Sequence, residues 1–184
     1  MCIILHLRRL TKRDVAVEET DLPQDLTILV GTQTGIAQLV AQAIELRLEG
    51  EANVRVRMMD ALDASVFAAG GLFLICTSTY GQGDVPDNAR QLYESLCTER
   101  PDLSNVRYGV IALGDRTYAQ TFCFGAKRFD KLLTELGAQR VGEIMLNDAS
   151  DGTLPEDEAV VWIEGWMTLC RQLPEAAQAK LDTV

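Results

Sequence analysis

The chain has 184 residues, of which 47% are hydrophobic and 6% aromatic, and its formal net charge at pH 7 is −10. This length fits one domain with a sizeable core, and the acidic excess argues against nucleic-acid or anionic-membrane partners and favours basic proteins. The five cysteines form no C-x-x-C pair, and no apolar run approaches the roughly 18 residues of a membrane span. We therefore expect a monomeric protein in the reducing cytoplasm.

Apolar runs alternate with segments of helical periodicity from residue 26 onward. The runs predict strands over five ranges, namely 26–30, 53–58, 71–77, 108–113 and 140–146. The helical stripes predict helices over 37–48, 89–96, 129–136 and 162–173. Strands and helices in this order predict an α/β fold in which a doubly wound, five-stranded parallel sheet forms the middle of an α/β/α sandwich.

The first 25 residues differ from the rest because they show no clear period. They carry four basic and five acidic residues. We divide the chain into an N-terminal extension of unknown role, 1–25, and a single domain, 26–184. The extension is open to three interpretations: a flexible arm, an added strand or an artefact of the start site.

The segment after the first strand is a candidate phosphate site, because ligands of doubly wound sheets bind beyond the carboxyl ends of the strands. Gly31 to Gly35 leads directly into a helix, whose N-terminus offers free N–H donors and the positive end of a dipole. Thr32 and Thr34 add hydroxyl donors. No Lys or Arg lies between residues 31 and 46, so this is not a Walker A loop. The alternative is an ordinary turn with Thr as the N-cap.

Two further loops each carry an aromatic side chain at the same edge of the sheet. Tyr80 follows the third strand beside Gly81 and Gly83, and Tyr118 follows the fourth strand. Two tyrosines on adjacent loops can sandwich a planar ring by offset stacking. Each loop alone is explained equally well as a glycine-rich turn, but the three together predict a site for a planar, phosphorylated ligand.

The residues of these loops resemble the three FMN loops of flavodoxins and of the FMN domain of cytochrome P450 reductase-type diflavin enzymes: Thr32-Gln33-Thr34-Gly35, Ser78-Thr79-Tyr80-Gly81 with Gly83-Asp84, and Leu113-Gly114-Asp115 with Tyr118. The resemblance extends from residue 26 to about 173 and is closest to the short-chain, MioC-type flavodoxins. It implies that 26–184 is a flavodoxin-like domain with FMN as its cofactor.

Carried over to this chain, the resemblance implies that residues 32–37 hold the FMN phosphate and that Tyr80 and Tyr118 stack on the two faces of the flavin ring. The Gly81 carbonyl would turn to accept a hydrogen bond from the reduced flavin, which a glycine allows because it tolerates positive φ. The full set of implied cofactor-binding residues is Thr32, Gln33, Thr34, Gly35, Ile36, Ala37, Ser78, Thr79, Tyr80, Gly81, Gly83, Leu113, Gly114, Asp115, Tyr118, Phe122, Cys123 and Asp148.

The chain departs from the family pattern in three places, one of which is that residues 140–147 contain no long insertion, which favours the short-chain type. Ile36 and Ala37 stand where relatives often carry Thr or Ser, which removes a hydroxyl donor from the phosphate loop. The segment 118–123 is one residue longer than in many relatives, so either Tyr118 or Phe122 could contact the ring, and we favour Tyr118. Four acidic residues are expected around the ring, where they would disfavour an anionic reduced flavin: Asp84, Asp87, Asp115 and Asp148.

These observations lead us to expect a low-potential one-electron carrier between a basic-faced NAD(P)H-dependent flavodoxin reductase and redox acceptor proteins. The alternative is a small NAD(P)H-dependent flavin or quinone reductase on the same fold, against which stands the lack of a recognisable nicotinamide-binding segment. A receiver domain with the same sheet order would need an acidic cluster after the first strand, and the chain has Gly-Thr-Gln-Thr there.

Overall fold

The computed structural model describes residues 24–172. Almost all of the predicted extension, and the end of the last predicted helix at residue 173, lie outside the described residues. The strands are β1 (Gln24–Gly31), β2 (Ala52–Met58), β3 (Gly71–Ser78), β4 (Val106–Gly114), β5 (Gln139–Arg140) and β6 (Met145–Asp148). The α-helices are α1 (Ile36–Arg47), α2 (Arg90–Glu99), α3 (Phe124–Glu135) and α4 (Pro155–Arg171), and a 3₁₀ turn, η3, covers Arg116–Tyr118.

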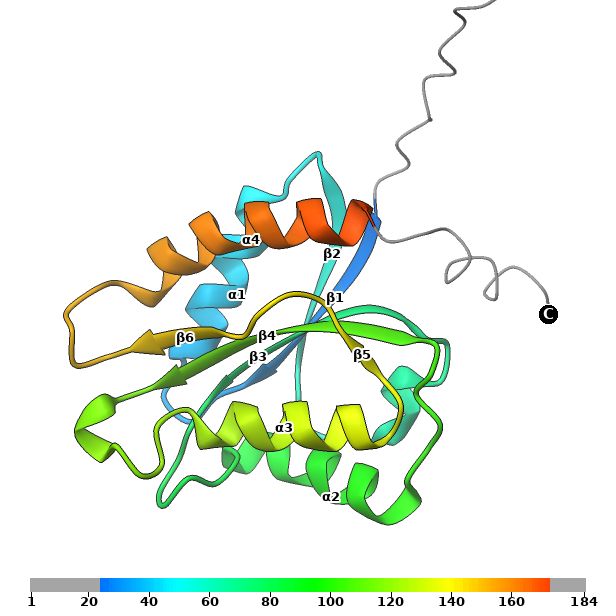
Figure 1. Ribbon diagram of the computed structural model, residues 1–184, viewed down its shortest axis with the longest axis horizontal. Helices are drawn as coiled ribbons and strands as arrows, with labels where there is room; N and C mark the ends of the chain where they lie inside the picture. The colour runs from blue at the N-terminus through cyan, green and yellow to red at the C-terminus, as the bar shows by residue number, and fades with distance from the viewer. Residues whose placement is uncertain (1–23, 173–184) are drawn as a thin grey trace, which may run out of the picture.

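The strands form one parallel sheet in the order β2-β1-β3-β4-β5, with β6 also paired to β4 (Figure 1). The winding direction reverses between β1 and β3, whose register places Ile28 beside Leu74. The predicted doubly wound sheet is therefore confirmed. The carboxyl ends of β1, β3 and β4 meet at one edge, where the ligand of such a fold is expected.

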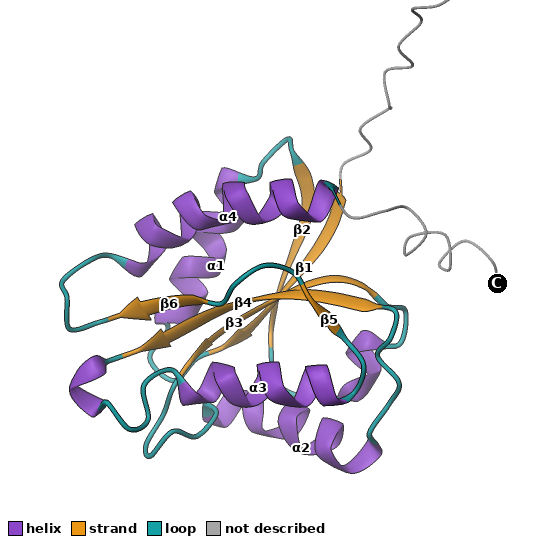
Figure 2. Cartoon of the chain, in the orientation of Figure 1, coloured by secondary structure: helices purple, strands orange, loops and turns teal. Residues whose placement is uncertain are grey.

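Helices cover both faces of the sheet (Figure 2). On one face α1 and α4 pack through buried residues such as Val40, Ile44 and Ile163. On the other face α2 and α3 pack through Leu92, Leu96 and Phe129 among others. The two apolar clusters confirm the α/β/α sandwich, and they hold the loops at the carboxyl edge on a rigid frame.

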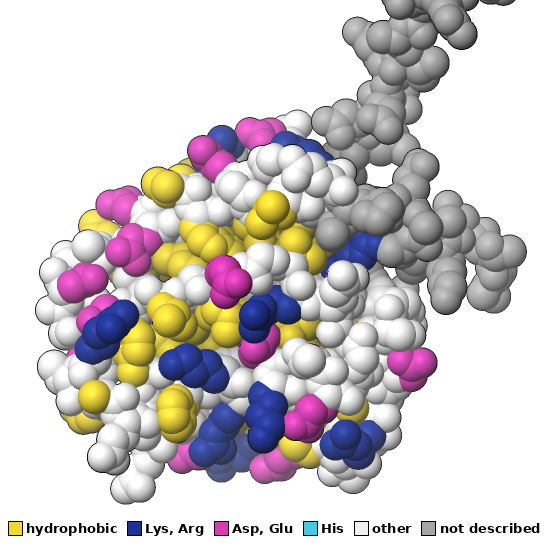
Figure 3. All heavy atoms as spheres, viewed as in Figure 1, with side chains coloured by type: hydrophobic (Ala, Val, Ile, Leu, Met, Phe, Trp, Pro, Cys, Tyr) yellow, Lys and Arg dark blue, Asp and Glu magenta, His cyan; other side chains and the backbone are white. Residues whose placement is uncertain are grey.

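The fifth predicted strand, 140–146, is divided into β5 and β6. Between them the chain leaves β4: Val141 N still donates to the Tyr108 carbonyl at 2.8 Å, but the Val141 carbonyl accepts a hydrogen bond from Trp166 Nε1 at 2.9 Å. Gly142 then adopts a φ of +67°. The chain returns to β4 where Ile111 pairs with Met145. Apolar side chains gather along this side of the molecule, between α4 and α3 (Figure 3).

Two helices begin earlier than their apolar stripes predict. α3 starts at Phe124 instead of residue 129, and α4 starts at Pro155 instead of residue 162. In α4 the proline occupies the first turn, and Glu156, Asp157 and Glu158 follow it. Proline and acidic residues suit a helix N-terminus, which has unpaired N–H groups and a positive dipole end. No helix among residues 24–172 is long and apolar enough to cross a membrane.

Candidate ligand cavity

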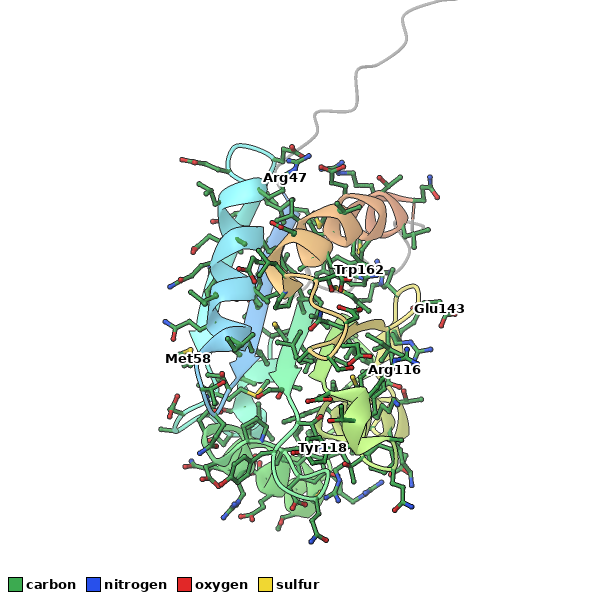
Figure 4. All side chains as sticks on the ribbon, turned by 90° about the vertical axis from the view of Figure 1, so that its left-hand side faces the viewer. Arg47, Met58, Arg116, Tyr118, Glu143 and Trp162 are labelled. Carbon is green, nitrogen blue, oxygen red and sulfur yellow. The ribbon has the colours of Figure 1, made fainter. Side chains whose placement is uncertain are left out.

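A cavity of about 660 Å³ opens at the carboxyl ends of the strands. Figure 4 looks onto this end of the sheet and shows Arg116 and Tyr118 on the loop that follows β4. Predicted site residues that border the cavity are Thr34, Ile36, Ser78, Thr79, Gly81, Leu113, Gly114, Asp115 and Tyr118. The structure therefore brings all three predicted loops to one cavity.

The first loop presents backbone donors at the start of α1. Gly35 has a φ of +93° and precedes the helix, where Gln38 N and Leu39 N already donate to its carbonyl. The amides of Ile36 and Ala37 have no acceptor among the described residues. Thr32 Oγ1 accepts from Gly35 N at 2.8 Å, so the hydroxyl proton of Thr32 stays free to donate. This arrangement suits an anion, because unpaired amides and the helix dipole both favour negative charge.

The 3₁₀ turn that precedes α2, Asp87–Ala89, fixes the first loop from the side. Asn88 Oδ1 accepts from Thr32 N at 2.8 Å, and Asn88 Nδ2 donates to the Val30 carbonyl at 3.2 Å. Gln33 and Asp87 exchange two longer hydrogen bonds of 3.3 and 3.4 Å. The anion cradle is thus held open by side chains of a neighbouring loop.

The second loop is a tight turn around Gly81. Tyr80 N donates to the Asp84 carbonyl at 3.0 Å, and Asp84 N donates back at 2.8 Å. Gly81 and Gly83 have φ values of +53° and +96°, which L side chains rarely adopt. Gly81 borders the cavity, whereas Tyr80, 46% exposed, does not border it in this conformation.

In the third loop, the two aromatic residues between which the sequence does not decide lie in different environments. Tyr118 borders the cavity and is 68% exposed. Phe122 is 9% exposed and lies under two cations, with Arg116 Cζ 4.7 Å and Lys127 Nζ 5.5 Å from its ring centroid. The geometry favours Tyr118 as the residue available to a ligand, and its stacking on a flavin stays a prediction.

Several predicted site residues do not border the cavity. Ala37 is fully buried in the apolar cluster between the sheet and α1. Cys123 is also fully buried, and its Sγ lies 3.3 Å from the Ala112 carbonyl oxygen. Burial raises the pKa of the Cys123 thiol to about 11. The complete set outside the lining is Thr32, Gln33, Gly35, Ala37, Tyr80, Gly83, Phe122, Cys123 and Asp148. Seven of them belong to the three loops, Ala37 lies in the first turn of α1 and Asp148 ends β6, and none of them lines the cavity in this conformation.

The sequence analysis named only Asp148 from the fourth wall of the cavity, between β6 and α4, and missed the residues that line it. Its lining residues are Asn147, Ala149, Thr153, Leu154, Pro155 and Glu156, and Leu39 and Thr121 also border the cavity. Asn147 is only 2% exposed, and its Nδ2 donates to Glu158 Oε2 at 2.9 Å. The signal was present, because this segment also follows the carboxyl end of a parallel strand.

The acidic residues near the site are mostly paired with arginine. Asp84 contacts Arg128 at 3.3 Å and Asp87 contacts Arg90 at 2.6 Å. A third ion pair joins Asp148 to Arg116 at 3.2 Å. Their effect on a bound anion is smaller than the sequence alone indicates. Asp115 and Glu156 border the cavity and have no Lys or Arg partner among residues 24–172.

The described residues hold no group of three or more His, Cys, Asp or Glu side chains that could bind a metal ion. A doubly wound parallel sheet with an anion cradle and a tyrosine-bearing loop at its switch point defines the class of flavodoxin-like α/β proteins. The Flavodoxin family model matches residues 28–162, and the chain belongs to the flavodoxin family.

Curated relatives and solved structures agree with this membership. The chain is 42% identical over 146 residues to Flavodoxin YqcA of Escherichia coli, covering 79% of this chain and 97% of that protein. It is 35% identical over 147 residues to Protein MioC of the same species, covering 80% of this chain and 99% of that one. A structure of a point mutant of the flavodoxin from Pseudomonas aeruginosa has a TM-score of 0.70 at 32% identity, with 79% of this chain and 97% of that chain covered.

A further relative is the sulfite reductase [NADPH] flavoprotein alpha-component of Vibrio parahaemolyticus. It is 44% identical over 116 residues, which is 61% of this chain and 18% of that protein. The resemblance to a diflavin-type FMN domain inferred from the sequence therefore has a counterpart among known proteins.

Proposed function

We propose that this chain binds FMN non-covalently in the cavity and transfers single electrons between protein partners at low potential. One observation carries the proposal: the unpaired amides at the start of α1 and the exposed side chain of Tyr118 lie at the same cavity of about 660 Å³. This volume lies within the usual range of small-molecule sites. Bound FMN would supply the one-electron chemistry.

The residues present fit FMN at the phosphate end. The Ile36 amide and the Thr34 hydroxyl, both from residues at the cavity wall, would bind the phosphate, and the Ala37 amide and Thr32 hydroxyl of the same loop would assist them, without a cationic side chain. A Cβ added at Gly35 would meet no atom within 4 Å, so the loop is open beside the anion position. Ile36 and Ala37 carry no side-chain hydroxyl, so only their backbone amides could donate to the phosphate.

The second and third loops would enclose the ring. Tyr118 would stack on one face and Tyr80, which does not line the cavity in this conformation, on the other, and Gly81 lies at the cavity wall. Asp115 and Glu156 add unpaired negative charge near the ligand, which disfavours an anionic reduced ligand and lowers the potential. Salt weakens this effect because both carboxylates are near solvent.

The electron donor we propose is a basic-faced, NAD(P)H-dependent reductase. The net charge of −10 favours association with such a surface. Two relatives of this chain support the assignment. One is named a flavodoxin, and the other is the flavoprotein component of an NADPH-dependent sulfite reductase. Redox acceptor proteins would take the electrons onward.

Titration of the purified protein with FMN, followed by flavin fluorescence, tests the proposal first. We expect quenching with FMN and weaker binding of riboflavin, which lacks the phosphate. Thr34→Ala should weaken FMN more than riboflavin, while Thr168→Ala, on the exposed side of α4, is the matched control. A protein that binds neither flavin would contradict the proposal.

Stepwise anaerobic reduction of the FMN-loaded protein then tests the carrier role. We expect two separated one-electron reduction steps. The reduction potential of the second step should lie below the corresponding potential of free FMN. Steady NADPH oxidation by the isolated protein would instead indicate the flavin or quinone reductase alternative.

A further inference from the structure

We propose that Asp148 and Arg116 form a latch that positions the Tyr118-bearing turn at the mouth of the cavity. Neither residue borders the cavity, so the pair acts on a ligand through Tyr118. Asp148 is thereby a positioning residue instead of the cofactor contact that the family resemblance implies. The inference rests on the proposed function only for its flavin-binding readout.

The carboxylate of Asp148 joins two walls of the cavity. Its Oδ1 accepts from the Arg116 amide at 2.9 Å, from the Ser150 amide at 3.0 Å and from Ser150 Oγ at 2.7 Å. The side chain is 12% exposed. The loop after β4 and the loop after β6 therefore share one acceptor.

The side chain of Arg116 adds a second connection on the outer side of the turn. Its Nε lies 3.2 Å from Asp148 Oδ2, and its guanidinium lies over the ring of Phe122, 4.7 Å from the centroid. Phe122 itself packs into the apolar cluster beneath α3. Arg116, the first residue of η3, is thus connected both to Asp148 at the end of β6 and to Phe122, which follows the turn.

Tyr118 depends on this bracing because its own side chain is not anchored. Its hydroxyl makes no hydrogen bond among the described residues, and its ring is 68% exposed. The backbone of the turn fixes it instead: Tyr118 N donates to the Asp115 carbonyl at 3.1 Å, and Thr121 N donates to the Tyr118 carbonyl at 2.9 Å. Movement of η3 therefore moves the ring that closes the cavity.

The first test compares FMN affinity in Arg116→Gln, Asp148→Asn and the double variant. Loss of the ion pair should weaken FMN about fivefold in Arg116→Gln. The double variant should lose little more FMN affinity than the weaker-binding single variant. Each single substitution already breaks the same Arg116–Asp148 ion pair. Arg55→Gln removes the same charge from an exposed pair with Asp25 on the sheet edge, and its affinity should change less than about twofold.

The second test needs no flavin. Amide hydrogen exchange over residues 115–122 of the unliganded protein should rise in Arg116→Gln and in Asp148→Ala, but not in Arg55→Gln. Unchanged exchange in both variants would overturn the latch. Raised exchange with unchanged FMN affinity would overturn its role in the cavity. If the wild-type chain bound no FMN, the proposed function would fail while exchange still decided the latch.

Discussion

The indole nitrogen of Trp166 donates to the carbonyl of Val141 across 2.9 Å, and this hydrogen bond lies where the last strand is interrupted. Both residues are buried, at 2% and 5% exposure. A buried carbonyl without a partner is costly. The contact therefore fixes α4 to the gap between β5 and β6.

Trp166→Phe should lower the free energy of unfolding by about 1–3 kcal/mol, because it leaves the Val141 carbonyl without its donor. Urea unfolding measures this difference. FMN affinity should stay unchanged, since Trp166 does not border the cavity. Trp162→Phe is the control: Trp162 stacks on Trp166 at 5.7 Å between centroids and is only half-buried, so a smaller loss is expected.

Gly109→Ala and Gly165→Ala should change stability in opposite directions. A Cβ at Gly109 would lie 2.5 Å from the Trp166 ring, and this overpacking should cost about 1–3 kcal/mol. A Cβ at Gly165, on the exposed side of α4, would meet nothing within 4 Å. There alanine should add about 0.5–1 kcal/mol through helix propensity. Thermal unfolding of both variants checks the contrast, and equal effects would contradict it.

Tyr118→Ala and Phe122→Ala separate binding from stability. Loss of the exposed Tyr118 ring should weaken FMN about two- to tenfold and leave the unfolding free energy of the unliganded protein nearly unchanged. Loss of the buried Phe122 ring should cost about 3 kcal/mol of stability. Tyr118→Phe should retain affinity. If Phe122→Leu, which keeps an apolar side chain, weakened FMN more than Tyr118→Ala, the assignment of the ring contact would be reversed.

Thiol labelling should distinguish the cysteines. Among the described ones Cys97 is exposed, whereas Cys76, Cys123 and Cys170 are buried. Burial raises the pKa of Cys76 and of Cys170 to about 12. At pH 8 iodoacetamide should therefore modify Cys97 first, with the other three reacting only in urea. Peptide mapping by mass spectrometry reads the result, and early labelling of Cys123 in the folded protein would contradict the burial of its thiol.

The stability difference between wild type and Asp148→Asn should depend on pH. The hydrogen bond from the Arg116 amide, with those from Ser150 and the Arg116 charge, holds the pKa of Asp148 below its ordinary value of 3.8. A carboxyl whose pKa is lowered by folding stabilises the protein above its unfolded pKa and loses this contribution as the pH falls through the folded pKa. The difference should thus be full at pH 6 and vanish below the folded pKa. Urea midpoints from pH 6 to 2.5 test this.

The sequence predicted the sheet and its helix coverage because buried parallel strands are continuous apolar runs, of which Gly71–Thr77 is an example. It could not predict the division of the last strand, since that depends on a tertiary hydrogen bond from Trp166. The start of α4 was placed late because its polar first turn, Glu156 to Glu158, carries no apolar stripe.

At the site, the sequence predicted the loops but not which atoms face the cavity. Thr34, Gly81 and Tyr118 border it as expected. The burial of Phe122 and the pairing of Asp84 with Arg128 arise from residues that approach from other elements, which a local motif does not encode. The same applies to the wall between β6 and α4.

The gap between β5 and β6 also governs how the sheet meets other chains. An uninterrupted edge strand presents a row of free backbone groups that a second molecule can extend, as in fibril growth. Here that edge is reduced to two residues in β5 and four in β6. The opposite edge, β2, turns Arg55 and Arg57 outward, and charged side chains on an edge strand disfavour pairing with another chain. The hydrogen bond from Trp166 thus protects the folded protein against edge-to-edge aggregation.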